Sequence, residues 1–368
     1  MEMKQNKKKI KYYSLKKVQS LSCQYNMIIG ERSNGKTYAV LDHILKTYCE
    51  TKKQGAIVRR WQDDFKGKRA LAMYAPLVSD GLIFKYTKGQ WDRIYYQSGQ
   101  WYLARYDDVL DKIIHADDPF CYAFSLSSME HDKSTSYPNI TTICFDEFLT
   151  RGYYLPDEFV LFMNVISTIV RQRIDVTIYM LGNTVNWTAP YFSEMGIKHI
   201  KEMKQGTIDV YTYGAEGELK VAVEYCAPLG NSKDSNIYFA FDNPRLNMIT
   251  SGAWELDIYP HLTVKFKPKN IKGIFFICFE GDTLQCEVVE LGRNAFIYIH
   301  VKTSPLHDYD NDMIYTVTDD YRINYYKSLI RGRDKRSQII AMLFKMDKVY
   351  YQNNEVGEIV RNYRQVTD

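Results

Sequence analysis

Residues 30–37 are the first group whose types and spacing could do chemistry, because they read Gly-Glu-Arg-Ser-Asn-Gly-Lys-Thr. This is a complete phosphate-binding loop of the Gly-x-x-x-x-Gly-Lys-Thr type. Its glycines permit backbone conformations in which successive N–H groups point at phosphate oxygens. Lys36 can reach the β- and γ-phosphates, and the Thr37 hydroxyl can ligate Mg²⁺. We therefore expect a nucleoside triphosphate to contact Gly30, Glu31, Arg32, Ser33, Asn34, Gly35, Lys36, Thr37 and Tyr38.

A carboxylate pair, Asp146 and Glu147, ends the apolar run 140–145. Such a run is typical of a buried parallel strand, and ligands bind at the carboxyl edge of parallel sheets. Asp146 suits a water-mediated contact to Mg²⁺, and Glu147 suits activation of the attacking water. The sequence therefore predicts a site that binds and hydrolyses ATP, with Thr37 and Asp146 as metal ligands. Asn183, just past another predicted strand, could sense the γ-phosphate or simply form an Asx-turn.

Two arginines, Arg171 and Arg173, end a predicted helix at 156–173, whose apolar residues recur at helical spacing. The helix dipole stabilises a cation at this end by only about 0.3–1 kcal/mol. This effect is a sufficient structural reason for one of the two arginines. The second arginine could therefore have another role.

The phosphate-binding loop needs a strand before it and a helix after it. A strand at 25–29, a helix at 38–48 and a strand at 55–60 together indicate a parallel βαβ unit. Further core strands are expected at 122–126 and 176–181. Short aromatic strands of a small antiparallel insertion are expected at 82–86, 91–97 and 100–105.

A change of composition at 227–235 indicates a domain boundary. We expect an ATPase domain over 1–230 with a lysine-rich N-terminal arm, a connector over 231–257 that contains a short helix, and a C-terminal domain over 258–368. The C-terminal strands are predicted at 263–267, 274–280, 286–291 and 295–301, and its helices at 318–332, 335–347 and 355–364. The predicted fold class is therefore α/β, a P-loop NTPase of the ASCE type with a parallel sheet flanked by helices, followed by a small α+β domain.

A net charge of +4 over 368 residues excludes a polycation, so contact with nucleic acid must come from local clusters. Candidates are Lys66, Lys68 and Arg69 in a predicted loop, and Arg331, Arg333, Lys335 and Arg336 near the C-terminus. Each cluster could instead be a solvated charged surface. The seven cysteines are scattered, which favours reduced thiols in a cytosolic compartment. Because no apolar stretch approaches about 18 residues, we expect no membrane-spanning segment.

The order of the motifs closely resembles that of the DNA-packaging ATPases of phi-twenty-nine-like podophages. The resemblance is carried by residues 28–37, Val58-Arg59-Arg60, Tyr137-Pro138-Asn139, residues 144–148, Val170-Arg171-Gln172-Arg173 and Leu181-Gly182-Asn183. It covers residues 1–230 well and is loose afterwards. Membership would imply a homo-oligomeric ring, commonly a pentamer, that drives double-stranded DNA into an empty prohead by ATP hydrolysis. The ring would act in the host cytoplasm, docked transiently on the portal vertex, and would be absent from the mature virion.

The resemblance also implies roles for single residues of the site. It makes Lys36 and Thr37 the phosphate and Mg²⁺ ligands, Asp146 the acid of the metal site and Glu147 the base. Asn183 would be a polar sensor of the nucleotide.

Three further residues would act between subunits. The resemblance nominates Arg171 as an arginine finger that enters the neighbouring subunit's site, with Arg173 as the fallback. A cation on the γ-phosphate can increase the rate by about 10³–10⁵. Lys133 resembles a position where the family places a basic residue at the subunit interface.

Related terminase motors carry an RNase H-like nuclease domain, of which the resembled family has a vestigial version. The carboxylates available in this chain are Glu280, Asp282, Asp308, Asp310 and Asp312. They fit surface groups better than a two-metal site, so we expect no nuclease activity. The basic C-terminal cluster would then contact DNA phosphates, the portal or, as in some relatives, a structural RNA.

Two other functions stay open from the sequence. A P-loop helicase or recombination ATPase would share Lys36 and Glu147, although no helicase motif set is recognisable. A nucleotide-gated assembly factor would bind ATP without useful turnover, and the presence of Glu147 argues against it.

Overall fold

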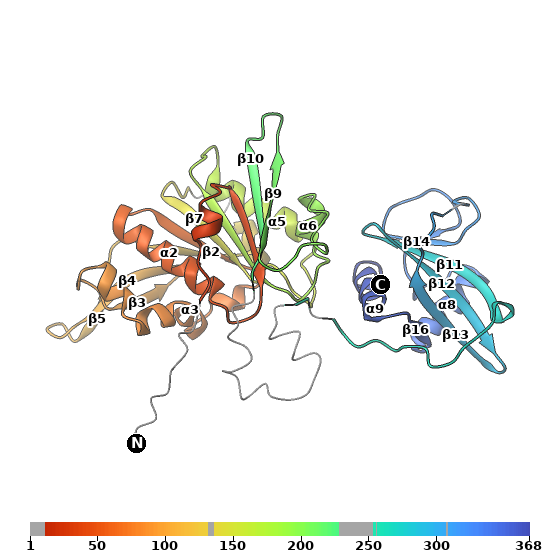
Figure 1. Cartoon of the computed structure of the whole chain (residues 1–368). Coiled ribbons are helices and arrows are strands. Elements are labelled where there is room, and N and C mark those ends of the chain that lie inside the picture. The colour runs from red at the N-terminus through yellow and green to blue at the C-terminus, as the bar shows by residue number, and fades with distance from the viewer. Residues whose placement is uncertain (1–11, 132–135, 228–252, 255, 307) are drawn as a thin grey trace, which may run out of the picture. The chain divides into compact units, whose positions relative to one another are not determined.

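The computed structural model describes residues 12–131, 136–227, 253–254, 256–306 and 308–368 (Figure 1). The chain divides into two compact units, Met1–Trp254 and Glu255–Asp368, and each unit has its own sheet. Most of the predicted connector 231–257 lies outside the described residues, so its predicted helix has no counterpart to compare.

The apolar runs of the first unit become the centre of a ten-stranded sheet, ordered β3-β4-β6-β2-β7-β8-β1-β10-β9, with β5 paired to β4. Its strands are β1 (Tyr25–Gly30), β2 (Gln54–Arg59), β3 (Arg93–Gln97), β4 (Gln100–Asp107), β5 (Lys112–His115), β6 (Cys121–Ser125), β7 (Ile140–Asp146), β8 (Thr177–Asn183), β9 (Thr207–Tyr213) and β10 (Leu219–Tyr225). The run from β6 to β10 is parallel, and β3, β4, β5 and β9 add to it antiparallel. Every residue of β1 is buried, as expected for a strand covered on both faces. The predicted parallel α/β sheet is confirmed.

Helices cover both faces of this sheet. They are α1 (Lys16–Gln19), α2 (Lys36–Thr51), α3 (Lys68–Ser79), α4 (Leu82–Tyr86), α5 (Glu158–Val170) and α6 (Pro190–Glu194), with 3₁₀ turns η1 (Gln62–Phe65) and η2 (Leu126–His131). Neighbouring residues of a strand point to opposite faces. Cys144 of β7 accordingly faces the core built on α2, whereas Phe145 stacks on Phe162 of α5 with ring centroids 4.8 Å apart. Helix α2 lies so close to β2 that a Cβ on Gly55 would meet Ile44 at 2.4 Å, which explains the glycine.

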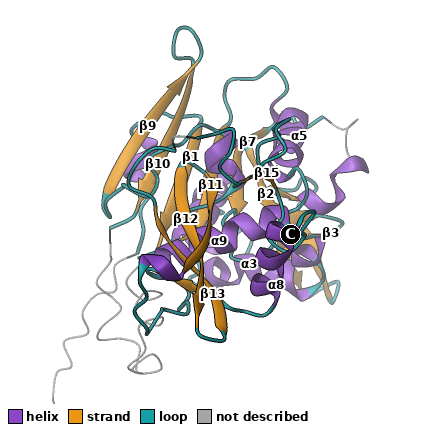
Figure 2. Ribbon diagram, turned by 90° about the vertical axis from the view of Figure 1, so that its right-hand side faces the viewer, coloured by secondary structure: helices purple, strands orange, loops and turns teal. Residues whose placement is uncertain are grey.

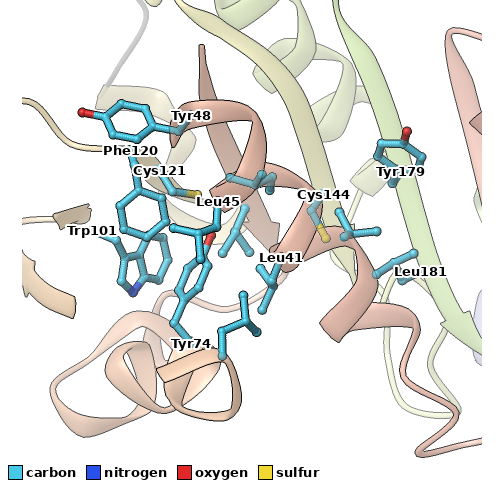
Figure 3. Packing of buried hydrophobic residues seen from close by; sticks show 14 of the residues in the cluster. Leu41, Leu45, Tyr48, Tyr74, Trp101, Phe120, Cys121, Cys144, Tyr179 and Leu181 are labelled. Carbon is cyan, nitrogen blue, oxygen red and sulfur yellow. The ribbon is translucent and has the colours of Figure 1, made fainter. Parts of the chain in front are cut away.

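An aromatic core joins α2, α3 and the antiparallel strands. Tyr74 of α3 lies beside Trp101 of β4 and Phe120 (Figure 3), with ring centroids 5.7 and 5.0 Å away in T-shaped geometry. All three rings are buried, and the indole N–H of Trp101 donates to the carbonyl of Ala70 over 2.9 Å. Leu45 of α2 belongs to the same cluster. The helix that follows the phosphate-binding loop is therefore anchored in the core along its length.

Two predictions for the first unit are wrong. Residues 82–86, predicted as a strand, form helix α4. The helix begins after Gly81, which has a φ of 70° and separates α4 from α3. Five residues, four of them apolar or aromatic, are too few for their spacing to distinguish a strand from a helix, and packing of Ile83 into the core favours the helix. Lys68 and Arg69, predicted in a loop, begin helix α3, whose buried residues Ala70, Tyr74 and Leu77 have helical spacing.

The second unit contains a mixed six-stranded sheet, ordered β15-β14-β11-β12-β13-β16. Its strands are β11 (Ile271–Phe279), β12 (Asp282–Leu291), β13 (Asn294–Val301), β14 (Ile314–Thr316), β15 (Tyr325–Tyr326) and β16 (Val349–Tyr351), and its helices are η4 (Pro268–Asn270), α8 (Lys335–Lys345) and α9 (Asn354–Thr367). Strands β11 to β13 form an antiparallel meander, while β14 and β16 pair parallel to β11 and β13. Helices α8 and α9 pack on this sheet (Figure 2), so the α+β prediction is confirmed.

Two predicted elements of the second unit are absent from the described residues. Residues 263–267 alternate like a strand but lie in an extended segment before Pro268 that joins no sheet. Residues 318–332, predicted as a helix, form turns and the short strand β15. The Asp320 carboxylate accepts the backbone N–H of Arg322, a local bond that competes with a helix.

Candidate nucleotide-binding site

The carboxyl ends of β1, β7 and β8 meet at a cavity of about 440 Å³. The strands pair in parallel, with Gly30 opposite Asn183 and Asp146 opposite Leu181. The cavity is lined by Arg32, Ser33, Asn34, Gly35, Lys36, Thr37, Tyr38, Asp146, Glu147, Leu181, Gly182 and Asn183. The topology thus brings together the predicted phosphate-binding loop, the carboxylate pair and the predicted sensor.

The start of helix α2 is open towards this cavity. Its N-cap residue is Gly35, with a φ of 89°, which has no side chain to cap the helix. The first N–H groups of a helix lack intrahelical partners, and a phosphate can accept hydrogen bonds from them. The side-chain Nδ2 of Asn34 is also buried without a hydrogen-bond partner in the described part of the chain. Because Asn34 Oδ1 accepts the Lys36 N–H over 3.2 Å, the unpartnered atom is a donor, as anion binding requires.

Lys36 crosses the base of the loop. Its Nζ donates to the carbonyls of Glu31 and Gly30 over 2.7 and 3.3 Å and to Asn183 Oδ1 over 3.3 Å. Burial lowers the pKa of Lys36 to about 8, although nearby acidic groups, Asp146 among them, oppose the shift. The lysine is therefore a cation at neutral pH whose charge a bound phosphate would stabilise.

The predicted metal ligands Thr37 and Asp146 are in contact. The Thr37 hydroxyl donates to Asp146 Oδ1 over 3.0 Å, and Asp146 is only 4 % exposed. A hydroxyl and a carboxylate that face a phosphate site are the oxygen donors that Mg²⁺ prefers. The residues present therefore fit Mg²⁺ bound together with nucleotide.

Arg59, at the end of β2, bridges both carboxylates of the site. Its guanidinium lies 2.6 Å from Asp146 Oδ2 and 2.7 Å from Glu147 Oε2. Burial opposes its charge, but the two carboxylates outweigh burial and raise the pKa of Arg59. Glu147 has a φ of 61°, in the left-handed region, and its side chain is 64 % exposed. Arg59 is part of the motif Val58-Arg59-Arg60, to which the sequence alone assigns no role. Its position at the end of a strand that pairs with β7 is the feature that could have indicated a role in the site.

Arg60 stabilises the backbone that follows Glu147. Its guanidinium forms a buried pair with Glu158, at 2.7 and 2.8 Å, and donates to the carbonyl of Phe148 over 2.9 Å. The Tyr191 hydroxyl donates to Glu158 over 2.7 Å. These bonds fix the backbone that follows Glu147 to the start of α5. From the sequence, Arg60 was part of a motif without an assigned role, and Glu158 was not singled out.

The N-terminal segment holds the phosphate-binding loop from outside. The Tyr13 N–H donates to the carbonyl of Asn34 over 2.9 Å, and the Tyr12 ring lies against Gly35. The Tyr13 hydroxyl donates to Glu224 Oε2 over 2.5 Å. Burial raises the pKa of Glu224, an effect that this hydrogen bond opposes. The strap formed by residues 12–13 therefore links the loop to β10.

Arg171 and Arg173 lie at the other end of β7. Arg173 donates to the carbonyl of Ile140, the first residue of β7, over 2.6 Å, and also to those of Tyr137 and Pro138. Asp146 is the last of the seven residues of that strand, about 20 Å away. Arg173 therefore anchors the start of β7, and neither arginine reaches the cavity of its own subunit. Arg171 follows α5 with a φ of 51°.

Of the other predicted contact residues, none that the structure describes lines this cavity. Lys133 falls outside the described residues. Lys66 pairs with Asp63 over 2.6 Å on an exposed surface. In the second unit, Arg331 and Arg333 line a separate cavity of about 430 Å³, where the Arg333 guanidinium lies 4.1 Å from the centroid of the Tyr326 ring. The remaining two basic residues, Lys335 and Arg336, occupy the first turn of α8.

The described residues contain no group of three or more His, Cys, Asp or Glu side chains placed to hold a metal ion. Two of the acidic candidates face polar partners instead, since Asp310 pairs with Arg322 over 3.2 Å and Asp308 accepts from Asn311. Among the helices that the structure describes, none has the length and apolar character to cross a membrane.

Comparison with known proteins finds similarity to DNA packaging proteins of phages. The family model described as Podovirus DNA encapsidation protein (Gp16) matches residues 108–207. The chain is 29% identical to the DNA packaging protein of Bacillus phage phi29 over 313 residues, covering 84% of this chain and 83% of that protein. The DNA packaging protein of Bacillus phage PZA is 24% identical over the same share of each chain.

Two solved structures share the fold along nearly the whole chain. The bacteriophage Phi-29 viral genome packaging motor assembly has a TM-score of 0.57 at 20% identity and covers 96% of this chain and 99% of its own. The Phi-28 gp11 DNA packaging motor has a TM-score of 0.51 at 17% identity, over 97% and 98% of the two chains. The resemblance expected from the order of the motifs is confirmed.

Proposed function

We propose that this chain is the ATPase subunit of a phage genome-packaging motor, which hydrolyses ATP and moves double-stranded DNA into a preformed prohead. The observation that carries the proposal is the similarity to DNA packaging proteins of Bacillus phages over 84% of the chain, combined with a complete phosphate-binding site. The same similarity favours packaging over the alternative of a helicase or recombination ATPase.

In the proposed reaction, the open start of α2 and Lys36 bind the phosphates, and Asn183 orients the lysine through its 3.3 Å contact. Thr37 and Asp146 would hold Mg²⁺, which when bound neutralises charge on the phosphate oxygens. Glu147 accepts a proton from the attacking water. For this step the Glu147 carboxylate has to leave Arg59, because a carboxylate held by a cation is a weaker base.

We propose that the missing cation comes from a second copy. Arg171 ends α5 two residues before Arg173, which binds the start of β7 about 20 Å from Asp146, so a neighbour's site is the one proposed for it. A ring, commonly of five copies, provides such neighbours. Arg173 is occupied by backbone carbonyls, which disfavours it as the finger.

The proposed partners are duplex DNA, the phage portal and, by resemblance, a structural RNA. The ring would assemble in the host cytoplasm and leave the portal vertex before the virion matures. The basic residues Arg331, Arg333 and Arg336 are candidates for contacts to phosphates, which would make binding salt-dependent and independent of sequence.

The test is ATP-dependent packaging of duplex DNA into purified proheads, measured as protection of DNA from nuclease. Wild-type protein should protect DNA, and Lys36→Ala and Glu147→Gln should not. Unwinding of a forked duplex without packaging would favour the helicase alternative. An ATPase rate unchanged in Glu147→Gln would instead favour an assembly factor that uses ATP only as a ligand.

A further inference from the structure

The outer face of helix α8 carries an apolar stripe in addition to the face that packs on the sheet. The inner face is buried through Ile340, Ala341, Leu343 and Phe344. The outer stripe consists of Ile339, Met342 and Met346, the residue that ends the helix, which are 48 %, 50 % and 55 % exposed. Residues three and four apart lie on one side of a helix. A surface helix normally presents polar residues on its outer side, so this apolar stripe indicates a contact surface.

The α8 stripe lies in a basic stretch of the chain. Residues 335–348 contain four cations and a single acid, Asp347. Lys345 and Lys348 flank Met346, where the helix ends and leads into β16. The arginines proposed to contact DNA precede the helix or lie in its first turn, at the other end. Because contacts to nucleic acid are made mainly by polar groups to phosphates, apolar side chains between the lysines fit a protein partner better.

A second exposed apolar surface, which we call the acidic tip, is formed by loops 308–312 and 319–324. Asn324 joins the two loops by donating to two carbonyls of the first one, over 2.9 and 2.6 Å. The tip exposes Tyr321 at 95 % and Ile323 at 87 %. Its two loops contain five aspartates and one arginine. The acidic tip therefore resembles the α8 stripe in its apolar side chains and is opposite to it in charge.

The two surfaces lie at opposite edges of the second sheet. The acidic tip flanks β14 and β15 at one edge, whereas α8 leads into β16 at the other. Strands are spaced by about 4.8 Å, so the edges of a six-stranded sheet are about 24 Å apart. The tip and the end of the stripe are thus too far apart to meet within one copy. Each meets a surface of opposite charge in a second copy, and two different surfaces that join copies head to tail can close a ring.

We infer that the acidic tip of one copy binds the end of the α8 stripe of the next copy. The apolar side chains of the tip cover Met342 and Met346. Its carboxylates face Lys345 and Lys348, and this complementarity of charge sets the direction of the contact. The inference rests on the proposed function, which needs a ring of copies, and it supplies surfaces that join neighbouring second units.

The experiment measures self-association of the full-length protein, freed of nucleic acid, by sedimentation velocity. Lys345→Glu with Lys348→Glu reverses the charge of the stripe. Asp310→Lys with Asp319→Lys reverses the tip, at side chains that are 83 % and 93 % exposed. Each pair of substitutions should raise the dissociation constant by about tenfold, because attractions become repulsions. All four substitutions in one chain make the surfaces complementary again and should restore most of the association.

A matched control and an apolar variant complete the set. Lys272→Glu with Arg293→Glu makes the same change of charge as the reversed stripe, at exposed residues outside both surfaces, and should keep the wild-type constant. Tyr321→Ser removes a side chain that is 95 % exposed, so the core stays intact, and should weaken association by about tenfold. This variant decides the matter if the charge-reversed proteins do not fold.

The contact is overturned by a wild type that stays monomeric at every soluble concentration, or by single reversals that leave its association unchanged. Failure of the fourfold variant to recover would overturn the pairing of these two surfaces. A reversed stripe that loses binding of DNA or RNA but still associates would assign the stripe to nucleic acid instead. DNA packaging by the wild type separates the two proposals. Association without packaging contradicts the motor and leaves the contact standing, whereas packaging with association that ignores both reversals contradicts the contact alone.

Discussion

Arg59 lies 2.7 Å from Glu147 and 2.6 Å from Asp146, so one guanidinium holds both carboxylates of the candidate site. In the proposed reaction Glu147 acts as the base, and Asp146 anchors the metal. The ion pair with Glu147 must open before the glutamate can accept a proton, whereas Asp146 can stay in contact. Arg59 is thus placed to control when hydrolysis begins.

Replacement of Arg59 by Ala should uncouple hydrolysis from DNA. Without the ion pair to Arg59, Glu147 can accept a proton whether or not DNA is bound. The ratio of ATPase rates with and without duplex DNA should therefore fall towards one. Steady-state phosphate release measures this ratio. Arg93→Ala, which removes an exposed arginine paired with Asp92, is the matched control and should keep the wild-type ratio. An Arg59→Ala protein with unchanged DNA stimulation would contradict control by Arg59.

Glu147→Gln should bind ATP normally and hydrolyse it slowly. Loss of a general base typically costs about 10²–10⁴ in rate, while Lys36 and the loop that binds phosphate stay intact. Single-turnover hydrolysis and ATP titration separate the two effects. Glu202→Gln changes an exposed glutamate with a 77 % accessible side chain and should be silent. Parallel losses of rate and affinity in Glu147→Gln would indicate a structural defect instead.

ATP affinity should fall as the pH rises through about 8. Burial lowers the pKa of Lys36 from 10.5 to about 8, so the free protein loses this proton above that pH. Bound phosphates favour the protonated lysine, and binding above pH 8 must then take up a proton at a limiting cost of about tenfold per pH unit. Calorimetric titration between pH 7 and 9.5 measures the dependence. Lys36→Arg keeps its charge throughout and should show a flatter profile, whatever its absolute affinity. A wild-type profile as flat as that of Lys36→Arg would argue against the lowered pKa.

Arg60→Met should destabilise the first unit by about 3–5 kcal/mol, because it leaves the fully buried Glu158 without a cation. Urea denaturation measures the loss. The double variant Arg60→Met and Glu158→Met removes both charges and should recover much of the stability. A double variant no more stable than the single one would show that the pair, rather than the burial of one charge, sustains the fold.

The part of the site that follows from local spacing was predictable. Residues 30–37 specify their own geometry through two glycines, a lysine and a threonine, and Asp146 follows from a strand that ends in a carboxylate. Arg59 could not be assigned a role, because its partners lie 87 and 88 positions away and only the pairing of β2 with β7 brings them together.

The errors in the fold have a common cause. Residues 82–86 and 318–332 have patterns that agree with more than one element, and tertiary contacts decide between them. Ile83 is drawn into the core as part of a helix, and polar side chains such as Asp320 hold the second segment in turns. In longer helices such as α5 and α9, apolar residues recur at helical spacing over several turns, so the pattern agrees with a helix alone. Both helices were predicted.

The strap at Tyr13 has a practical consequence for anyone who handles this protein. Because the Tyr13 amide is bonded to the carbonyl of Asn34, a cleavage or an inserted label at residues 12–13 would release the backbone that cradles the phosphates. Labels for studies of turnover are better placed away from these two residues.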